Sequence, residues 1–227
     1  MINWNWKQLG ELMRMKHSSM PLGDLAALKF DTISTVPSGI NERLRAQGNS
    51  CLEVDMNTLR ALPDGTVGRE FARLLDKRGL QPFKISASMK ERLANNPYAL
   101  RYTTTHDLFH VLTGFPTTPS GELGLFAFMI AQGFGGGDRS ILWLSLALYA
   151  ALVPLHFRGA LHNVKLGLAM GEKARPLLEE PLEQYLAEPL PEVRRRLNLP
   201  DPLSAGIDPG HESVLFNWLV PKEPVTA

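Results

Sequence analysis

Apolar residues recur at intervals of three or four along most of this chain, and the alternating patterns typical of strands are scarce. Residues 22–33 (LGDLAALKFDTI) and 67–79 (VGREFARLLDKRG) both show the helical interval, the second directly after the turn LPDG. The pattern over residues 85–96 predicts a further helix, with Ser86 or Ser88 as its N-cap. The pattern predicts an all-α fold.

Two neighbouring helices are predicted in the middle of the chain from their capping residues. Threonines 103–105 offer an N-cap for a helix through HDLFHVL, which Gly114 and Pro116 end. Ser120 then caps a second helix, with Glu122 in its first turn. We therefore expect two helices that face each other across a short loop.

Residues 140–153 (SILWLSLALYAALV) contain no charged side chain and are followed by Pro154. The stretch is shorter than the roughly 20 residues that cross a bilayer, so we expect a central buried helix and no membrane span. Two interpretations stay open for this helix, a plain core element or the wall of a lipid cavity.

The length of 227 residues is enough for one helical domain with a substantial core. We expect a weakly patterned N-terminal segment (1–24), a helical domain (25–199) and an irregular, proline-rich C-terminal segment (200–227). Arginines 194–196 are expected to lie solvated at the end of a helix. No internal repeat is visible.

The charges almost cancel, since 24 Lys and Arg face 23 Asp and Glu, and this balance argues against binding to nucleic acid. The single cysteine, Cys51, cannot form an intrachain disulfide, which fits a reducing compartment. The N-terminal residues lack the apolar run of a secretory signal peptide. We expect a cytoplasmic protein.

Two of the six histidines, His106 and His110, lie one helical turn apart, and Asp107 follows the first. At about 100° per residue, all three side chains fall in one narrow sector of the helix. Imidazoles at i and i+4 can close on one cation, and Glu122, separated from His110 by eleven residues, can reach back across the loop. His106, Asp107, His110 and Glu122 therefore form a candidate metal site.

This donor set of two nitrogens and two carboxylates does not select one cation, because zinc, manganese, iron and magnesium each tolerate part of it. A zinc protease would have glutamate in place of Asp107. The alternative is an ordinary helical protein whose histidine pair is structural. We assign His156, His162 and His211 to structural roles.

Three stretches carry a resemblance to a known family: TVGREFARLL, ALRYTTTHDLFHVLTGFPTTPSGELGLFAF and GEKARPLLEEPLEQYLAEPLPEVRRRL. They resemble the coenzyme Q (ubiquinone) biosynthesis protein four family over roughly residues 25–199, in the form of a bacterial-type member. The pattern His-Asp-x-x-His, eleven residues, Glu is that family's signature.

The resemblance implies an all-α, single-domain multi-helix bundle with an apolar lipid-binding cavity or groove beside a metal site. It also implies a divalent metal, usually zinc, held by His106, Asp107, His110 and Glu122, and a homodimer that binds long isoprenoid lipids at the inner face of a membrane. Other quinone-biosynthesis enzymes are expected partners. The isoprenoid tail is expected to contact apolar residues of the next two helices, namely Leu125, Phe126, Met129, Leu142, Trp143 and Leu146.

Three functions stay open. The first is a metal-dependent enzyme that modifies the head group of a polyprenyl hydroxybenzoate, by oxidative decarboxylation of its ring. The second is a non-catalytic scaffold that binds the same isoprenoid lipid for a quinone-biosynthesis complex. The third is a binder or metal-dependent phosphohydrolase of a polyprenyl phosphate. The nature of the lipid bound to the protein separates the third from the first two.

Overall fold

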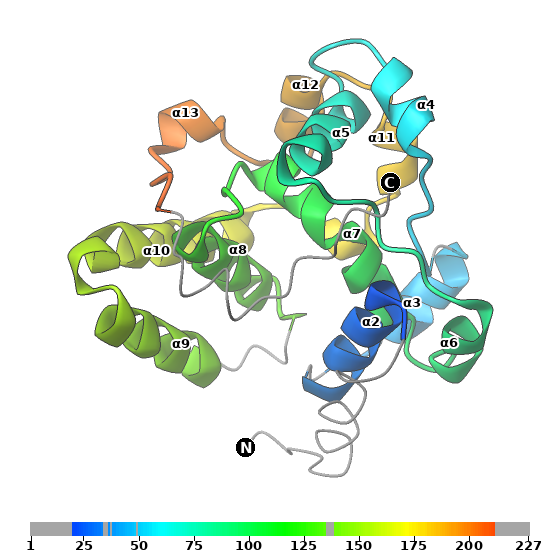
Figure 1. The fold of residues 1–227 in the computed structure, drawn as a ribbon, viewed down its shortest axis with the longest axis horizontal. Helices are drawn as coiled ribbons and strands as arrows, with labels where there is room; N and C mark the ends of the chain where they lie inside the picture. Colours follow the sequence, from blue (N-terminus) through cyan, green and yellow to red (C-terminus); the bar gives the residue numbers. More distant parts are fainter. Residues whose placement is uncertain (1–19, 34–35, 37, 49, 135–138, 212–227) are drawn as a thin grey trace.

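The computed structural model of the chain describes residues 20–33, 36, 38–48, 50–134 and 139–211. These residues form a single all-α domain without a β-strand, as the sequence predicts (Figure 1). The α-helices are α2 (Leu22–Ile33), α3 (Ile40–Gln47), α4 (Met56–Ala61), α5 (Val67–Arg78), α6 (Ala87–Arg92), α7 (Pro97–Thr113), α8 (Pro119–Ala131), α9 (Arg139–Leu152), α10 (Phe157–Lys173), α11 (Leu182–Tyr185), α12 (Leu190–Arg196) and α13 (Pro202–Ala205). Two short 3₁₀ helices, η2 (Pro154–His156) and η3 (Leu177–Glu179), connect them.

Helix α7 runs through the middle of the molecule and contacts α2, α3, α5, α8 and α12 (Figure 1). Its apolar residues Leu108, Phe109 and Leu112 are fully buried in the main core, where they join Phe71 of α5 and Phe128 of α8. Burial of each such side chain favours folding by about 1.5–3 kcal/mol relative to exposure. The helix that carries the candidate site is therefore held rigidly by apolar packing.

Glycines bring α8 and α10 into close contact along their length. A Cβ on Gly167 would lie 2.1 Å from the carbonyl oxygen of Gly124, and a Cβ on Gly171 would lie 2.4 Å from that of Phe128. Neither distance is possible for a real side chain, so the two backbones touch directly. This packing fixes α8, and with it Glu122, against the rest of the domain.

Arg101 of α7 is buried, with 1% of its side chain exposed, and links α7 to the segment after α10. Its guanidinium pairs with Glu183 and donates to the carbonyl oxygen of Glu180 at 2.9 Å. A buried cation is tolerated only when its donors are satisfied in this way. The pair therefore fastens η3 and α11 to the central helix.

The predicted helices over 22–33 and 67–79 are confirmed as α2 and α5, with Gly79 as the C-cap of α5. Of the two predicted caps for α6, Ser86 is the N-cap, and its side chain accepts a hydrogen bond from the Met89 amide. Of the predicted C-terminal segment 200–227, the structure describes residues up to 211, which include the short helix α13. The rest of that segment and residues 1–19 lie outside the described residues.

The prediction of a central buried helix over 140–153 is wrong. Helix α9 lies at one end of the molecule, beside α8 and α10 (Figure 1), and several of its large apolar side chains are exposed. The absence of charge led to the prediction, but it does not reveal how many helices are available to cover each face. Among the described residues, no helix has the length and apolar character needed to cross a bilayer.

The prediction that arginines 194–196 are all solvated is also wrong in one position. The Arg194 guanidinium donates to the carbonyl oxygens of Val111 and Leu112 at 2.8 and 2.9 Å. These carbonyls belong to the last turn of α7, which lacks intrahelical partners. Arg195 and Arg196 are exposed, and Arg196 pairs with Glu188.

Candidate metal centre

Helix α7 begins six residues before the predicted N-cap. Pro97 occupies its first turn, where a missing amide hydrogen is tolerated, whereas Thr103, Thr104 and Thr105 are buried inside the helix. Thr105 donates its hydroxyl to the carbonyl oxygen of Arg101 at 2.7 Å, and the two other threonines make the same backward bond. A threonine hydroxyl can cap a helix or bond to the preceding turn, and here it does the second.

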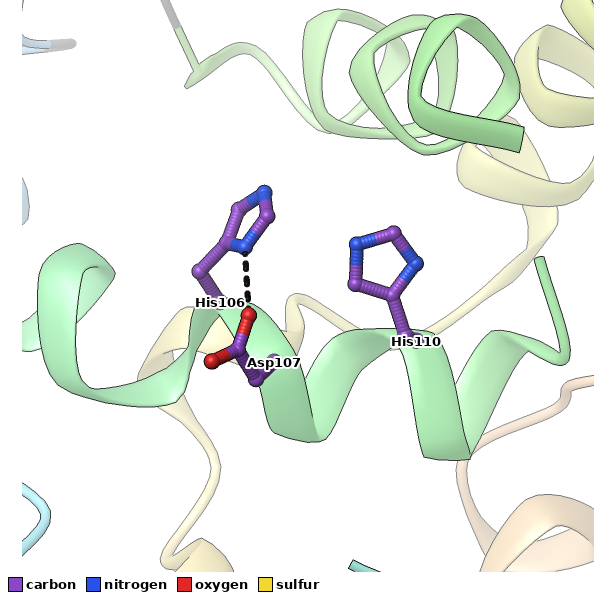
Figure 2. A group of neighbouring side chains, drawn as sticks. All are labelled: His106, Asp107 and His110. Carbon is purple, nitrogen blue, oxygen red and sulfur yellow. Dashed lines mark hydrogen bonds and ion pairs between the residues drawn. The ribbon is translucent and has the colours of Figure 1, made fainter. Parts of the chain in front are cut away.

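His106, Asp107 and His110 project from the same side of α7 (Figure 2). Each offers one ligand atom, and these atoms lie within 4.8 Å of one another. The two imidazole centroids are 5.0 Å apart, with the rings nearly perpendicular. The structure therefore brings together the three residues that the helical spacing places in one sector.

Hydrogen bonds at both Nδ1 atoms fix the tautomers of the two histidines. His110 donates from Nδ1 to the carbonyl oxygen of Phe115 at 2.9 Å, and His106 Nδ1 lies 3.2 Å from Oδ1 of Asp107 (Figure 2). Carbonyl and carboxylate oxygens only accept, so each Nδ1 carries the hydrogen and each neutral ring keeps its lone pair on Nε2. Metal-binding histidines are commonly oriented by such bonds.

Glu122 enters the site from α8 and faces both histidines. Its carboxylate oxygens lie 3.2 Å from His110 Nε2 and 3.7 Å from His106 Nε2. The His110 side chain is 1% exposed, whereas that of Glu122 is 44% exposed. The two Nε2 atoms thus converge on one carboxylate at the edge of the protein, while Asp107 approaches His106 from its Nδ1 side.

Glu122 lies in the first turn of α8, as predicted, but the helix begins earlier than expected. The N-cap position belongs to Thr118 and not to Ser120, which is buried within the first turn. Directly before Glu122, a Cβ on Gly121 would lie 1.9 Å from the carbonyl oxygen of Pro116. Because it lacks a Cβ, Gly121 allows the first turn of α8 to lie in direct contact with the preceding loop. A glycine directly before a candidate ligand is the feature of the sequence that indicates this close contact.

The charges of the site shift the acidity of its groups. Burial alone would lower the pKa of His110, but the Glu122 carboxylate and, to a smaller extent, Asp107 outweigh it and raise that pKa. Burial would raise the pKa of Glu122, but the two histidines and Lys29 lower it to about 2. The apoprotein therefore holds an ionised Glu122 that attracts a positive charge to the histidines.

Aromatic side chains border the histidines on the side of α2. Tyr102 meets the His106 ring edge-on at 5.7 Å between centroids, and Phe30 of α2 stacks on the same ring at 6.5 Å. Burial, together with Tyr98 and Glu122, raises the pKa of Tyr102, so its phenol stays protonated. No pattern in the sequence indicated that Phe30 lies beside His106, because α2 is distant from α7 in the chain.

The six residues predicted to bind lipid do not form one continuous wall. Leu125 and Met129 are buried in the main core, whereas Leu142 and Leu146 are buried in a second cluster between α8, α9 and α10, to which Phe126 also packs. Trp143 is exposed. A cleft of about 320 Å³ does reach His110 from the side of α5, but its lining includes none of the six.

The donor set and its geometry fit a divalent metal ion. His110 Nε2 is buried and makes no regular hydrogen bond, although a carboxylate oxygen lies 3.2 Å away. A lone pair that faces an anion repels it unless a proton or a metal ion lies between them. Two imidazole nitrogens with one or two carboxylates are an ordinary ligand set for zinc, and they also suit iron or manganese.

Residues 42–202 match the family described as Coenzyme Q (ubiquinone) biosynthesis protein Coq4. The chain is 35% identical over 159 residues to the zebrafish (Danio rerio) mitochondrial ubiquinone biosynthesis protein COQ4 homolog, a match that covers 66% of this chain and 55% of the relative. It is 31% identical over 150 residues to the mitochondrial homolog of Nematostella vectensis, with 64% of this chain and 71% of the relative covered. The match thus spans little more than half of the zebrafish protein.

The fold is also similar to a crystal structure of a protein from Nostoc punctiforme, whose name assigns it provisionally to ubiquinone biosynthesis. The TM-score is 0.58 at 21% sequence identity, and the similarity covers 84% of this chain and 86% of the other. This likeness concerns the fold alone. The extent of the family match, over residues that include the whole histidine and glutamate cluster, decides the classification: the chain belongs to the Coq4 family of coenzyme Q (ubiquinone) biosynthesis proteins.

Proposed function

We propose that this protein acts in the biosynthesis of ubiquinone or another prenylated quinone, as a metal-dependent protein that binds a polyprenyl hydroxybenzoate. The family match supports the pathway, because the relatives named above are ubiquinone biosynthesis proteins. The observation that carries the metal dependence is the buried His110 Nε2, which has no regular hydrogen bond and faces the Glu122 carboxylate.

His106 and His110 would hold the metal through Nε2, together with Glu122, and Asp107 would either add an oxygen ligand or orient His106 from its Nδ1 side. A bound divalent metal supplies Lewis-acid chemistry, which holds and polarises a carboxylate or phenolate oxygen. The carbonyl of Phe115 keeps the His110 ring in the ligating tautomer. The half-exposed Glu122 leaves this cluster open to a head group from solvent.

The reaction proposed for this head group is oxidative decarboxylation. The ring carbon loses its carboxylate as carbon dioxide and gains a hydroxyl whose oxygen comes from water. Two electrons and one proton leave with this exchange, and the electrons pass to an external two-electron acceptor. The residues of the site bind and orient the substrate, while the isoprenoid tail is placed among apolar residues of α8 and α9.

Metal content and turnover test this proposal in sequence. Protein purified without an affinity tag is expected to contain one divalent metal per chain by elemental analysis, and His110→Ala to contain little. His162→Ala is the matched control, because that histidine only contacts the carbonyl oxygen of Gly206 at the surface. Absence of stoichiometric metal in the wild-type protein would mean that the histidine pair is structural.

Incubation with a prenylated hydroxybenzoate and an electron acceptor then separates enzyme from scaffold. Release of carbon dioxide by the wild-type protein and its loss in His110→Ala would support the enzyme. Retained binding with no turnover under any metal or acceptor would leave the scaffold. Mass spectrometry of co-purified lipid gives the third outcome, since a polyprenyl phosphate would replace the benzoate as the substrate class.

A further inference from the structure

Residues 207–210, which follow α13, lie across the loop that joins the two helices with candidate ligands, α7 and α8. At the end of α7, a Cβ on Gly114 would lie 3.4 Å from the Ile207 side chain. At the start of α8, the Thr118 hydroxyl donates to the carbonyl oxygen of Pro209 at 3.0 Å. We call residues 207–210 the strap. The family match ends at residue 202, so the strap lies outside it.

Asn163 of α10 joins the strap to the first turn of α8. Its side chain is fully buried, and its amide nitrogen donates to the carbonyl oxygens of Ser120 and Asp208 at 3.3 and 2.9 Å. Its amide oxygen accepts from the backbone amide of Asp208 at 2.9 Å. These bonds engage the backbone of Asp208 and not its side chain. A buried amide whose donors and acceptor are all paired makes its surroundings rigid, so Asn163 fixes the strap against α8.

Thr118 occupies the N-cap position of α8, yet its side chain caps no backbone amide. A threonine at this position normally accepts from an amide of the first turn. Here its hydroxyl faces the strap, where a Cβ on Gly210 would lie 2.5 Å from it. Gly210 has a φ of 64°, a left-handed conformation that glycine adopts readily, and it lacks the Cβ that would prevent this contact. The start of α8 is therefore held from outside the helix.

The strap holds the part of α8 that carries Glu122. The Glu122 amide donates to the carbonyl oxygen of Thr118 at 2.8 Å, so the two residues belong to one helical turn. The direct backbone contact between α8 and α10 lies further along the helix, where Gly167 meets Gly124. The turn before that contact is held by the strap at Thr118 and by Asn163.

We propose that the strap and Asn163 hold Glu122 in place for metal binding, with Asn163 as a positioning residue. The inference rests on the proposed metal site, in which Glu122 lies 3.2 Å from His110 Nε2 while the first turn of α8 keeps its position. An open strap releases that turn and weakens metal binding. By thermodynamic linkage, a bound metal then opposes the opening of the strap by the same factor.

Hydrogen exchange of the Asp208 amide in the full chain, with and without saturating zinc, tests this coupling. That amide is bonded to Asn163, so it exchanges when the strap opens. Zinc is expected to slow the exchange about 10- to 100-fold, because loss of support for a metal ligand weakens binding over that range. The short helix α4, which packs on α5, is the internal control. It frays locally and is expected to exchange at the same rate with and without zinc.

Two variants open the strap to different degrees. Asn163→Ala is expected to remove the protection of the Asp208 amide and to weaken zinc binding about 10- to 100-fold in chelator competition. Thr118→Val keeps the shape of the side chain but loses the bond to Pro209. It is expected to speed exchange of the Asp208 amide in metal-free protein roughly three- to tenfold, the effect of one hydrogen bond. Thr58→Val in α4 is its matched control, because that hydroxyl also donates one bond at 3.0 Å, to a carboxylate; it is expected to leave exchange at Asp208 unchanged.

The visible absorption of bound cobalt(II) separates a positioning role from a merely structural one, since it depends on the ligands around the ion. Cobalt(II) in Asn163→Ala is expected to absorb differently from cobalt(II) in the wild-type protein, because Glu122 no longer keeps its place. A loss of stability alone leaves the spectrum of the folded protein unchanged, and circular dichroism shows that the variant is folded.

The outcomes keep this inference apart from the proposed metal function. Zinc that binds the wild-type protein without any effect on exchange at Asp208 would overturn the inference and leave the metal site intact. So would Asn163→Ala with an open strap but the zinc affinity and cobalt spectrum of the wild type. Thr118→Val gives the same decision if Asn163→Ala does not fold, because zinc is then required to slow its faster exchange. Wild-type protein that binds no zinc would overturn the metal function, and the inference with it.

Discussion

Replacement of Gly121 by alanine is expected to weaken both the fold and the metal site by one steric contact. The new Cβ would lie 1.9 Å from the carbonyl oxygen of Pro116, whereas real Cβ contacts essentially never fall below 3.0 Å. The obstacle is backbone, so no side-chain rotation relieves it. The start of α8 or the loop before it must move by about 1 Å, and Glu122 moves with the helix.

The cost can be estimated from two opposing effects. Overpacking of this kind costs about 1–3 kcal/mol, and a rigid backbone obstacle places Gly121→Ala at the upper end. Removal of a glycine from a helix returns about 1 kcal/mol. The net loss in the free energy of unfolding is expected to be about 2 kcal/mol, which lowers Tm by about 4–8 °C for a chain of this size.

The assay measures Tm of the metal-free protein in the presence of a chelator, and zinc affinity by competition with a chromophoric chelator. A displaced carboxylate is expected to lower zinc affinity about 10- to 100-fold, the range found when support for a ligand is lost. Gly159→Ala in α10 is the control, because the atoms nearest to its new Cβ belong to the side-chain carboxylate of Asp208, which can move where a backbone carbonyl cannot. Gly121→Ala with the Tm and the zinc affinity of the wild type would refute the steric argument.

Other substitutions test the same framework. Gly167→Ala is expected to cost about 2 kcal/mol in urea unfolding, because its Cβ would lie 2.1 Å from the carbonyl oxygen of Gly124. Zinc at 100 times its dissociation constant is expected to raise the free energy of unfolding by about 2.7 kcal/mol, as measured by denaturant titration, and His110→Ala is expected to abolish this increment. Arg194→Met is expected to lower the free energy of unfolding by about 1–3 kcal/mol in the same titration. The reason is that the carbonyl oxygens of Val111 and Leu112, at the end of α7, lose a charged hydrogen-bond donor.

Residue spacing predicted the fold class and most helices because their apolar positions follow the helical period. Helices α2 and α5 have the predicted starts, and Gly79 ends α5 as expected. The start of α7 was missed because threonine is ambiguous in sequence: its hydroxyl can cap a helix or bond to the preceding turn. Pro97, which is favoured in a first helical turn, was the better signal.

The burial of α9 could not be read from its composition. A helix without charge satisfies the sequence rule for a central element, but burial also depends on how many other elements pack around it. Here α8 and α10 cover one side, through Leu142 and Leu146, and leave Leu144 and Leu148 exposed. The same apolar pattern therefore fits a core helix and a helix with one exposed side.

Residue spacing determines one part of the candidate site, and the tertiary fold determines the rest. The interval of four residues places His106 and His110 on one side of α7 in any helix, and it would do so for two structural histidines as well. The fold adds the hydrogen bond from His110 Nδ1 to the backbone carbonyl of Phe115, which no sequence motif encodes, whereas the partner of His106 Nδ1 is its neighbour in the chain, Asp107. The fold also directs both Nε2 atoms toward the carboxylate of Glu122, an arrangement that a chelating pair requires.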